Sequence, residues 1–293
     1  MAIDTPATIA ILGAGPLGLE AALYARYLGY DAQVFERGEV AAGLVARSPQ
    51  DLPPWAECVS KLGLAALRAQ DSVWRPPSLE ARPTAAAWRD RYLRPLALSD
   101  LLVDSVREYA EALSVRLTPT GEARRDAGGD SAANAARGEL PIAEPAGEEP
   151  AGDEMVEWLE PDQPLEPNFE VVWRSTRGDG SLEVFPAHVV IDASGIGPTD
   201  PASAVDEGER AASGIALWSS DGGRRRRVQR RTQSGVALTT RAPNFFLLGA
   251  AALPPGETAI GIPAALGDIR ALFALVGGRD SLDLYATMDK LLP

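Results

Sequence analysis

The segment IAILGAGPLGLEAAL, residues 9 to 23, constrains the fold more than any other part of the chain. The apolar run at residues 7 to 12 ends at a glycine, as expected for a buried parallel strand. Residues 16 to 28 are rich in alanine and leucine and are followed by Gly29, which predicts a helix. A second strand, DAQVFE, follows at once. Strand, glycine turn, helix and strand predict a βαβ unit.

The glycines of this turn predict a dinucleotide site. Gly13, Gly15 and Gly18 form GxGxxG, in which the first permits the tight turn, the second admits a pyrophosphate and the third lets helix and strand pack closely. The helix N-terminus offers unpaired N–H groups to the phosphates. Glu36 lies 18 residues after Gly18, near the spacing of about 20 at which an acid accepts ribose hydroxyls. The neighbouring Arg37 could suggest a 2′-phosphate, but the carboxylate of Glu36 would repel one. NADP is therefore disfavoured at this site.

Further elements follow along the chain. Residues 43 to 97, rich in proline and tryptophan, indicate an irregular wrap with short helical pieces such as KLGLAALR. The apolar spacing after Ser99, a candidate N-cap, predicts an amphipathic helix over residues 99–113, followed by a short strand, SVRL. The next predicted elements are the hairpin strands NFEVVWRS and SLEVFPA, the strands HVVIDASG and NFFLLGA, and a helix from Ile262 to Val276.

The composition of the chain limits its partners and its location. The 293 residues carry a net charge of −13, which disfavours nucleic acid as a general partner. No apolar run predicts a membrane span and no basic leader is present, so a cytoplasmic location is expected. Residues 119–167 form an acidic, Gly/Ala/Pro-rich stretch expected to be a mobile insertion, and residues 198–235 a polar loop region. The latter contains the basic run Arg224–Arg231, which fits a solvated loop better than a phosphate patch.

The chain has a single cysteine and a single histidine, which limits the metal sites and catalytic groups that it can form. Cys58 cannot form a CxxC pair, and with only His188 the chain cannot build a zinc site from several Cys and His. His188 stands at the start of a predicted strand with no nucleophile motif nearby, which argues against a Ser-His-Asp triad. Cys58 among apolar neighbours is better explained as a core residue. No metal site is expected, and no catalytic residue is nominated.

Three motifs, ILGAGPLGLEAALYARYLGYDAQVFER, VVIDASGIG and NFFLLGA, resemble the FAD-binding domain of the two-dinucleotide-domain flavoproteins. That family includes flavin-containing monooxygenases, N-hydroxylating monooxygenases and pyridine nucleotide-disulfide reductase-like enzymes. The resemblance implies a single Rossmann-like FAD/NAD(P)-binding domain over residues 1–293, with a central parallel sheet, helices and a small antiparallel β-meander. It also implies the following cofactor-binding residues: Gly13, Ala14, Gly15, Pro16, Leu17, Gly18, Glu36, Arg37, Ala193, Ser194, Gly195, Gly249, Ala250 and Ile260.

The chain departs from that family in two ways. Ala250 stands where the family usually has an aspartate that binds a ribityl hydroxyl, which weakens the expected flavin contact. A second GxGxxG is absent, and the roughly 40 residues between VVIDASGIG and NFFLLGA cannot hold a nicotinamide domain of about 100 residues. The leading hypothesis is therefore an FAD-dependent oxidoreductase that needs a separate reductase or another electron donor, with a monooxygenase-like enzyme as its more specific form. The alternatives are a non-catalytic FAD-, NAD- or ADP-binding protein and an NAD-dependent dehydrogenase.

Overall fold

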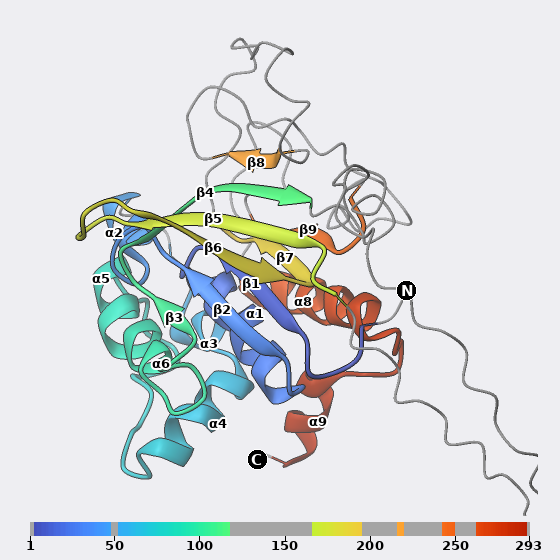
Figure 1. Ribbon diagram of the computed structural model, residues 1–293. Helices are drawn as coiled ribbons and strands as arrows, with labels where there is room; N and C mark the ends of the chain where they lie inside the picture. The colour runs from blue at the N-terminus through green and yellow to red at the C-terminus, as the bar shows by residue number, and fades with distance from the viewer. Residues whose placement is uncertain are drawn as a thin grey trace, which may run out of the picture. The chain divides into compact units, whose positions relative to one another are not determined.

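The computed structural model (Figure 1) describes residues 3–47, 52–117, 166–194, 216–219, 242–249 and 262–291. By its contacts the chain divides into one unit of Met1–Thr118 with Pro167–Pro293 and a second unit of Pro119–Glu166. The second unit lies outside the described residues except for Glu166. The basic run Arg224–Arg231 also lies outside them, as does most of the predicted loop region at 198–235.

A five-stranded parallel sheet forms the centre of the first unit, in the order β3-β2-β1-β7-β9. Its strands are β1 (Thr8–Leu12), β2 (Asp31–Phe35), β3 (Val106–Arg107), β7 (Val189–Asp192) and β9 (Phe245–Leu247). Ile9 pairs with Ala32 of β2 on one side and with Val189 of β7 on the other. Four of the five residues of β1 and all four of β7 are buried, because both faces of the sheet are covered. The predicted α/β fold with a parallel sheet is confirmed.

The two faces of this sheet belong to two different cores. Ile9 and Ile11 pack with the helices, whereas Ala10 and Leu12 pack with the second, antiparallel sheet. Alternate side chains of a strand point to opposite faces, so one short strand serves both cores. Helices α1 and α8 cover one face, and strands β4 to β6 cover the other (Figure 1).

Helix α1 (Pro16–Tyr27) begins and ends as the sequence predicts. Gly15 is its N-cap and Pro16 suits the first turn, while Gly29, with a φ of 87°, redirects the chain into β2. The C-terminal helix pair consists of α8 (Ile262–Gly277), which was predicted, and α9 (Leu284–Leu291), which was not. The rings of Tyr24 and Phe273 stack with their centroids 5.0 Å apart and join α1 to α8.

The proline- and tryptophan-rich wrap is a series of short helices. They are α2 (Ala42–Arg47), α3 (Trp55–Cys58), α4 (Lys61–Gln70), α5 (Ala85–Trp88), the π-helical turn η1 (Arg89–Leu93) and α6 (Arg94–Ala97). Ser60 caps α4 by accepting a hydrogen bond from the Gly63 N–H at 2.9 Å. Trp55 and Trp88 are buried in the same core as α1, which explains why so irregular a segment holds together.

The antiparallel sheet has the order β6-β5-β4-β8. Its strands are β4 (Ala110–Leu117), β5 (Phe169–Ser175), β6 (Leu182–Ala187) and β8 (Ala216–Ser219). The predicted hairpin of β5 and β6 is confirmed, and Gly180 in its turn has a φ of 74°. Strand β8 lies inside the region 198–235 that was expected to be loop, and it pairs with β4.

The prediction of a helix at residues 99–113 is wrong. The Ser99 hydroxyl donates backwards to the Leu96 carbonyl at 2.6 Å, and residues 106–107 form β3. Val106 instead pairs with Val34 at the edge of the parallel sheet, beside β2. Tyr109, with a φ of 58°, then turns the chain into β4, and a right-handed helix cannot contain that conformation. The pairing of β3 with β2 therefore prevailed over the helical spacing of the apolar residues in this segment.

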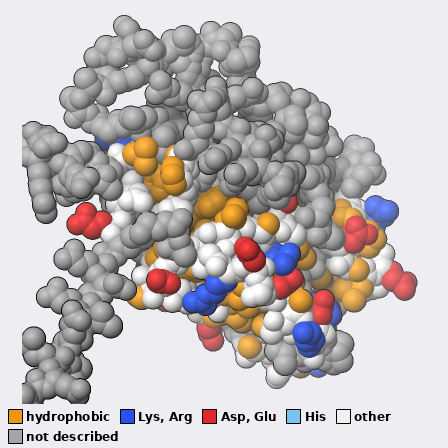
Figure 2. Space-filling view, turned by 90° about the vertical axis from the view of Figure 1, so that its right-hand side faces the viewer, with side chains coloured by type: hydrophobic (Ala, Val, Ile, Leu, Met, Phe, Trp, Pro, Cys, Tyr) orange, Lys and Arg blue, Asp and Glu red, His pale blue; other side chains and the backbone are white. Residues whose placement is uncertain are grey.

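The described surface carries mixed charge. On the face shown in Figure 2, Lys and Arg side chains are interspersed with Asp and Glu side chains. Among the described helices, none is long and apolar enough to cross a bilayer. No cluster of metal-ligating side chains occurs within the described ranges.

Candidate functional site

The order of the parallel strands marks one edge of the sheet as the expected place for a ligand. From β1 the chain runs outward through β2 to β3, and it later returns on the other side of β1 with β7 and β9. The order therefore reverses between β1 and β7, and ligands of open α/β sheets bind at the carboxyl ends of the strands at such a point. The loops after β1, β2, β7 and β9 meet there.

Gly13 follows β1 and lies against the loop after β7. A Cβ atom at Gly13 would lie 2.8 Å from the Cα of Ser194 and 3.0 Å from the carbonyl oxygen of Ala193, and its φ is 100°. The Ala193 N–H donates to the Leu12 carbonyl at 3.0 Å, which fixes the same approach. Only glycine fits at position 13, as predicted for the first glycine of the motif.

Gly15 and Gly18 have different surroundings. A Cβ at Gly18 would collide with the Gly13 carbonyl oxygen, so this glycine permits close packing within the turn. A Cβ at Gly15 would meet no described atom within 4 Å, and the backbone there is extended, with φ −75° and ψ −178°. No side chain caps the start of α1 within the described part of the chain. The second glycine thus faces open space beside the N–H groups at the start of α1, which a phosphate could occupy.

The Glu36 carboxylate joins the glycine turn to the loop after β2. Its Oε2 accepts a hydrogen bond from the Ala14 N–H at 2.9 Å, and its Oε1 accepts one from the Gly38 N–H at 3.0 Å. The side chain is half-buried, and an ionised carboxylate has about four acceptor sites, so two bonds leave capacity for a ligand. Glu36 therefore stands beside the turn as predicted and also holds its shape.

Arg37 is exposed, and its backbone is held by the β5–β6 turn. The Thr176 hydroxyl donates to the Arg37 carbonyl at 3.1 Å. Next to it, the Arg177 guanidinium lies 3.3 Å from the centre of the Tyr109 ring, and the Tyr109 hydroxyl donates to Glu39 Oε1 at 2.8 Å. The antiparallel sheet thus supports the loop that carries Glu36 and Arg37.

Leu17 and Gly249 lie next to each other on the side of the glycine turn that faces away from Glu36. Gly249 follows β9 with a φ of 63°, and a Cβ placed on it would lie 2.6 Å from the Cδ1 of Leu17. Leu17 is half-buried and packs partly against the main core. The late strand and the first turn of α1, which are far apart in the sequence, therefore meet at this contact.

Most of the predicted site residues lie along this one edge of the sheet. The structure brings together the loops that contain Gly13, Ala14, Gly15, Pro16, Leu17, Gly18, Glu36, Arg37, Ala193, Ser194 and Gly249. Gly195, Ala250 and Ile260 lie outside the described residues. The role of all of these residues in binding a cofactor stays a prediction.

His188 and Cys58 have structural surroundings. The His188 N–H donates to the Thr8 carbonyl at 2.9 Å, and its Nδ1 accepts from the Thr8 N–H at 3.0 Å. His188 therefore lies at the amino end of the sheet, opposite the glycine turn. Cys58 is fully buried, its thiol donates to the Pro53 carbonyl at 3.5 Å, and burial raises its pKa to about 12. A thiol held neutral in this way is a poor nucleophile.

Sequence reasoning missed a buried carboxyl group in α1. Glu20 is 3% exposed, and its Oε1 accepts a hydrogen bond from the Tyr285 hydroxyl of α9 at 3.1 Å. Burial raises the pKa of Glu20 to about 7, although hydrogen bonds from Ser60 and Tyr285 lower it. The glutamate was visible inside the predicted helix, but no sequence signal connected it to α9.

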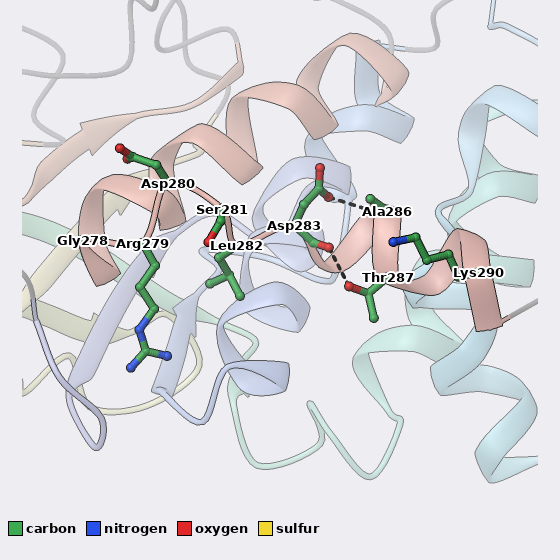
Figure 3. A pocket seen from close by; sticks show the side chains of 9 residues that line it. All are labelled: Gly278, Arg279, Asp280, Ser281, Leu282, Asp283, Ala286, Thr287 and Lys290. Atoms are coloured by element: carbon green, nitrogen blue, oxygen red, sulfur yellow. Dashed lines mark hydrogen bonds between the residues drawn. The ribbon is translucent and has the colours of Figure 1, made fainter.

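A hollow lies at the opposite end of the parallel sheet from the glycine turn. It has a volume of about 680 Å³ and lies between the end of α8 and the start of α9 (Figure 3). One polar residue of its lining is paired: Asp283 accepts from the Ala286 N–H at 2.9 Å and forms an ion pair with Arg270 at 2.9 Å. The Ile3 N–H donates to the Val276 carbonyl at 2.8 Å, which places this end of α8 next to the segment before β1.

The sheet order and the glycine turn define a Rossmann-like α/β protein. No protein-family model matches the sequence, and no curated protein matches it. Among solved structures, the chain is similar to bacillithiol disulfide reductase Bdr (YpdA) from Bacillus cereus, at 17% identity and a TM-score of 0.37, over 70% of this chain and 45% of that one. It is also similar to OTEMO in complex with FAD and NADP, at 17% identity and a TM-score of 0.36, over 70% of this chain and 28% of that one.

A third solved structure, RebC-10x, matches at 13% identity and a TM-score of 0.32, over 68% of this chain and 33% of that one. The chain thus spans less than half the length of each of these three proteins. The fold assignment rests on the strand order and the turn geometry described above.

Proposed function

We propose that this protein binds FAD and uses it in oxidoreductase chemistry with an electron donor from outside the chain. The observation that carries the proposal is the placement of Glu36 beside the glycine turn, with open space at Gly15. An acceptor for ribose hydroxyls then stands next to N–H donors for a pyrophosphate. These are the two contacts that an adenosine diphosphate group requires.

Each part of the site has a role in this proposal. The N–H groups at the start of α1 bind the pyrophosphate, and Glu36 binds the ribose hydroxyls of the adenosine. Ala193, Ser194 and Gly249 lie on the other side of the glycine turn, and we expect Gly195, Ala250 and Ile260 to contact the cofactor as well. Bound FAD would supply hydride or electron transfer, and the protein would position it. The Glu36 carboxylate would repel a 2′-phosphate, so FAD or NAD suits this position better than NADP.

The external donor follows from the single GxGxxG of the chain. The roughly 40 residues between VVIDASGIG and NFFLLGA are too few for a nicotinamide domain of about 100 residues. Electrons would reach the flavin from a separate reductase, from the substrate itself or from a nicotinamide that binds without its own domain. The specific reaction that we propose is monooxygenase-like. No catalytic residue is assigned.

A second candidate function is non-catalytic binding of FAD, NAD or ADP. One observation favours it: Ala250 replaces the aspartate expected at a ribityl hydroxyl. This substitution weakens the half of the site that would hold a flavin. It leaves the half that would hold adenosine diphosphate unchanged.

The visible absorption spectrum of the purified full chain tests the proposal, followed by chromatography of any released nucleotide and titration with FAD. We expect flavin bands or uptake of added FAD. A colourless protein that takes up no FAD contradicts the proposal. FAD uptake without reduction by a nicotinamide or by an added reductase favours the non-catalytic alternative, and binding of NAD in place of FAD favours a dehydrogenase.

A further inference from the structure

Glu20 places a carboxyl group in the core between α1 and the C-terminal helix α9. The side chain is 3% exposed, and its Oε1 accepts a hydrogen bond from the Tyr285 hydroxyl of α9 at 3.1 Å. A second hydrogen bond comes from the hydroxyl of Ser60, the residue that caps α4. The carboxyl group is therefore in contact with α9 and with the start of α4.

The titratable groups around this carboxyl group are phenols and a thiol. Those that face Glu20 directly or through one neighbour are Tyr24, Tyr27, Cys58, Tyr92 and Tyr285. Burial raises the pKa of each of them, so all five are uncharged near pH 7. Within the described ranges, no cation acts on the pKa of Glu20. An ionised Glu20 would therefore be a buried charge with two hydroxyl donors and no counter-ion.

Helix α9 is held by half-buried side chains and by two ion pairs. None of its residues 284–290 is fully buried, and those that pack partly against the main core are Leu284, Tyr285 and Met288. Lys61 of α4 pairs with Asp289 at 2.7 Å, and Arg270 of α8 pairs with Asp283, just before α9, at 2.9 Å. These side chains are partly exposed, and exposed ion pairs contribute little to stability. Since α9 contributes no strand, it can detach while the parallel sheet stays folded.

We infer that the docking of α9 on α1 is pH-sensitive, because α9 is docked most firmly while Glu20 is protonated and detaches more often once Glu20 is ionised. A buried charge without a counter-ion is costly. Detachment of α9 removes Tyr285 from the carboxyl group and lets water reach it. The inference does not depend on the proposed function, since no nucleotide takes part.

The direction of the pH effect follows from the two states of Glu20. Burial raises its pKa to about 7 while α9 is docked, and the pKa returns towards the ordinary value of 4.5 when the carboxyl group is hydrated. A group with a raised pKa stabilises the docked state at low pH, and this contribution is lost as pH rises through 7. For this shift, the equilibrium constant for detachment should rise about 70-fold between pH 5 and pH 8.

Hydrogen–deuterium exchange of the full chain at pH 5 and pH 8, corrected for the intrinsic exchange rates, tests the inference. Glu20→Gln removes the ionisable group and nearly keeps its size. Glu57→Gln makes the same change at an exposed glutamate of α3 and is the matched control. Tyr285→Phe keeps the aromatic ring and removes the hydroxyl that donates to Glu20.

We expect the protection of residues 284–291 to fall at least tenfold from pH 5 to pH 8 in the wild type and in Glu57→Gln. It should fall less than threefold in Glu20→Gln, and Tyr285→Phe should lower it already at pH 5. At both pH values, α9 should be at least tenfold less protected than β1, because α9 opens without the sheet.

Three results would overturn the inference. The first is equal protection of α9 in the wild type at both pH values, and the second is an undiminished fall in Glu20→Gln. The third is equal protection of α9 and β1, which would mean that α9 opens only when the whole unit unfolds. If Glu20→Gln does not fold, Tyr285→Phe decides, because unchanged protection of α9 at pH 5 in that variant also overturns the inference.

Discussion

Replacement of Gly15 by valine separates nucleotide binding from folding. The extended backbone of Gly15, with φ −75° and ψ −178°, suits a β-branched residue, and a Cβ there meets no described atom within 4 Å. Loss of chain entropy in the unfolded state should stabilise the variant by about 0.4–1 kcal/mol. Loss of a favourable N-cap should cost about 1 kcal/mol. The free energy of unfolding should therefore change by less than about 1 kcal/mol.

Binding should change far more than stability in this variant. The valine methyl groups would occupy the space beside the N–H groups that the phosphates need. We expect affinity for FAD and for ADP to fall at least 100-fold, which corresponds to about 3 kcal/mol. The assay is calorimetric titration with each nucleotide, run together with chemical denaturation of the same preparations.

Two other glycines serve as comparisons. Gly267→Val places the same side chain in open space on α8 and should leave binding unchanged. Gly18→Ala forces a Cβ against the Gly13 carbonyl, so it should destabilise the fold by about 1–3 kcal/mol before any effect on binding is considered. If Gly15→Val keeps FAD and ADP affinities within twofold of wild type, the phosphates do not bind at this turn.

Three further predictions concern carboxylates and the Leu17 contact. Since burial raises the pKa of Glu20 from 4.5 to about 7, the contribution of Glu20 to native stability should be greatest below pH 4.5 and should fall by about 3 kcal/mol as pH rises from 4.5 to about 7. Glu20→Gln should abolish that fall in urea denaturation, and an unchanged pH profile would falsify this account. Glu36→Gln should weaken ADP binding at least tenfold, because an amide cannot accept both N–H bonds. The control is Glu57→Gln, which changes an exposed glutamate in the same way. Equal ADP affinities of Glu36→Gln and the wild type would contradict the role assigned to Glu36. Gly249→Ala should destabilise the fold by about 1–2 kcal/mol, chiefly because Gly249 has a φ of 63°, which an L side chain rarely adopts. The smaller part that comes from the Leu17 contact should disappear in a Leu17→Ala background, and additive effects in a double-mutant cycle would disprove the contact.

The first βαβ unit could be predicted from sequence because its signals are local. The apolar run before Gly13, the Pro16 at the helix start and the Gly29 after its end each act on neighbouring residues. The hairpin of β5 and β6 was predicted for the same reason. Where local signals agree with each other, the structure follows them.

The errors and omissions have long-range causes. Residues 106–107 form a strand that pairs with β2, which is far from them in the sequence. The partner of Glu20 belongs to α9, a helix that was not predicted. The Leu17 contact depends on the exact path of the chain after β9. The motifs predicted which loops would meet, whereas only packing determined which side chains would touch.

The two hydrogen bonds of Glu36 have a consequence for how the site meets a ligand. Fixing the backbone of one residue costs about 1–2 kcal/mol, and here the loops at Ala14 and Gly38 are already ordered in the resting protein. A nucleotide would therefore meet a preorganised surface and would not bear that entropy cost. A carboxylate with this supporting duty would also persist in descendants that had stopped binding nucleotides. The glycine turn and Glu36 can therefore be retained for their structural role after nucleotide binding has been lost.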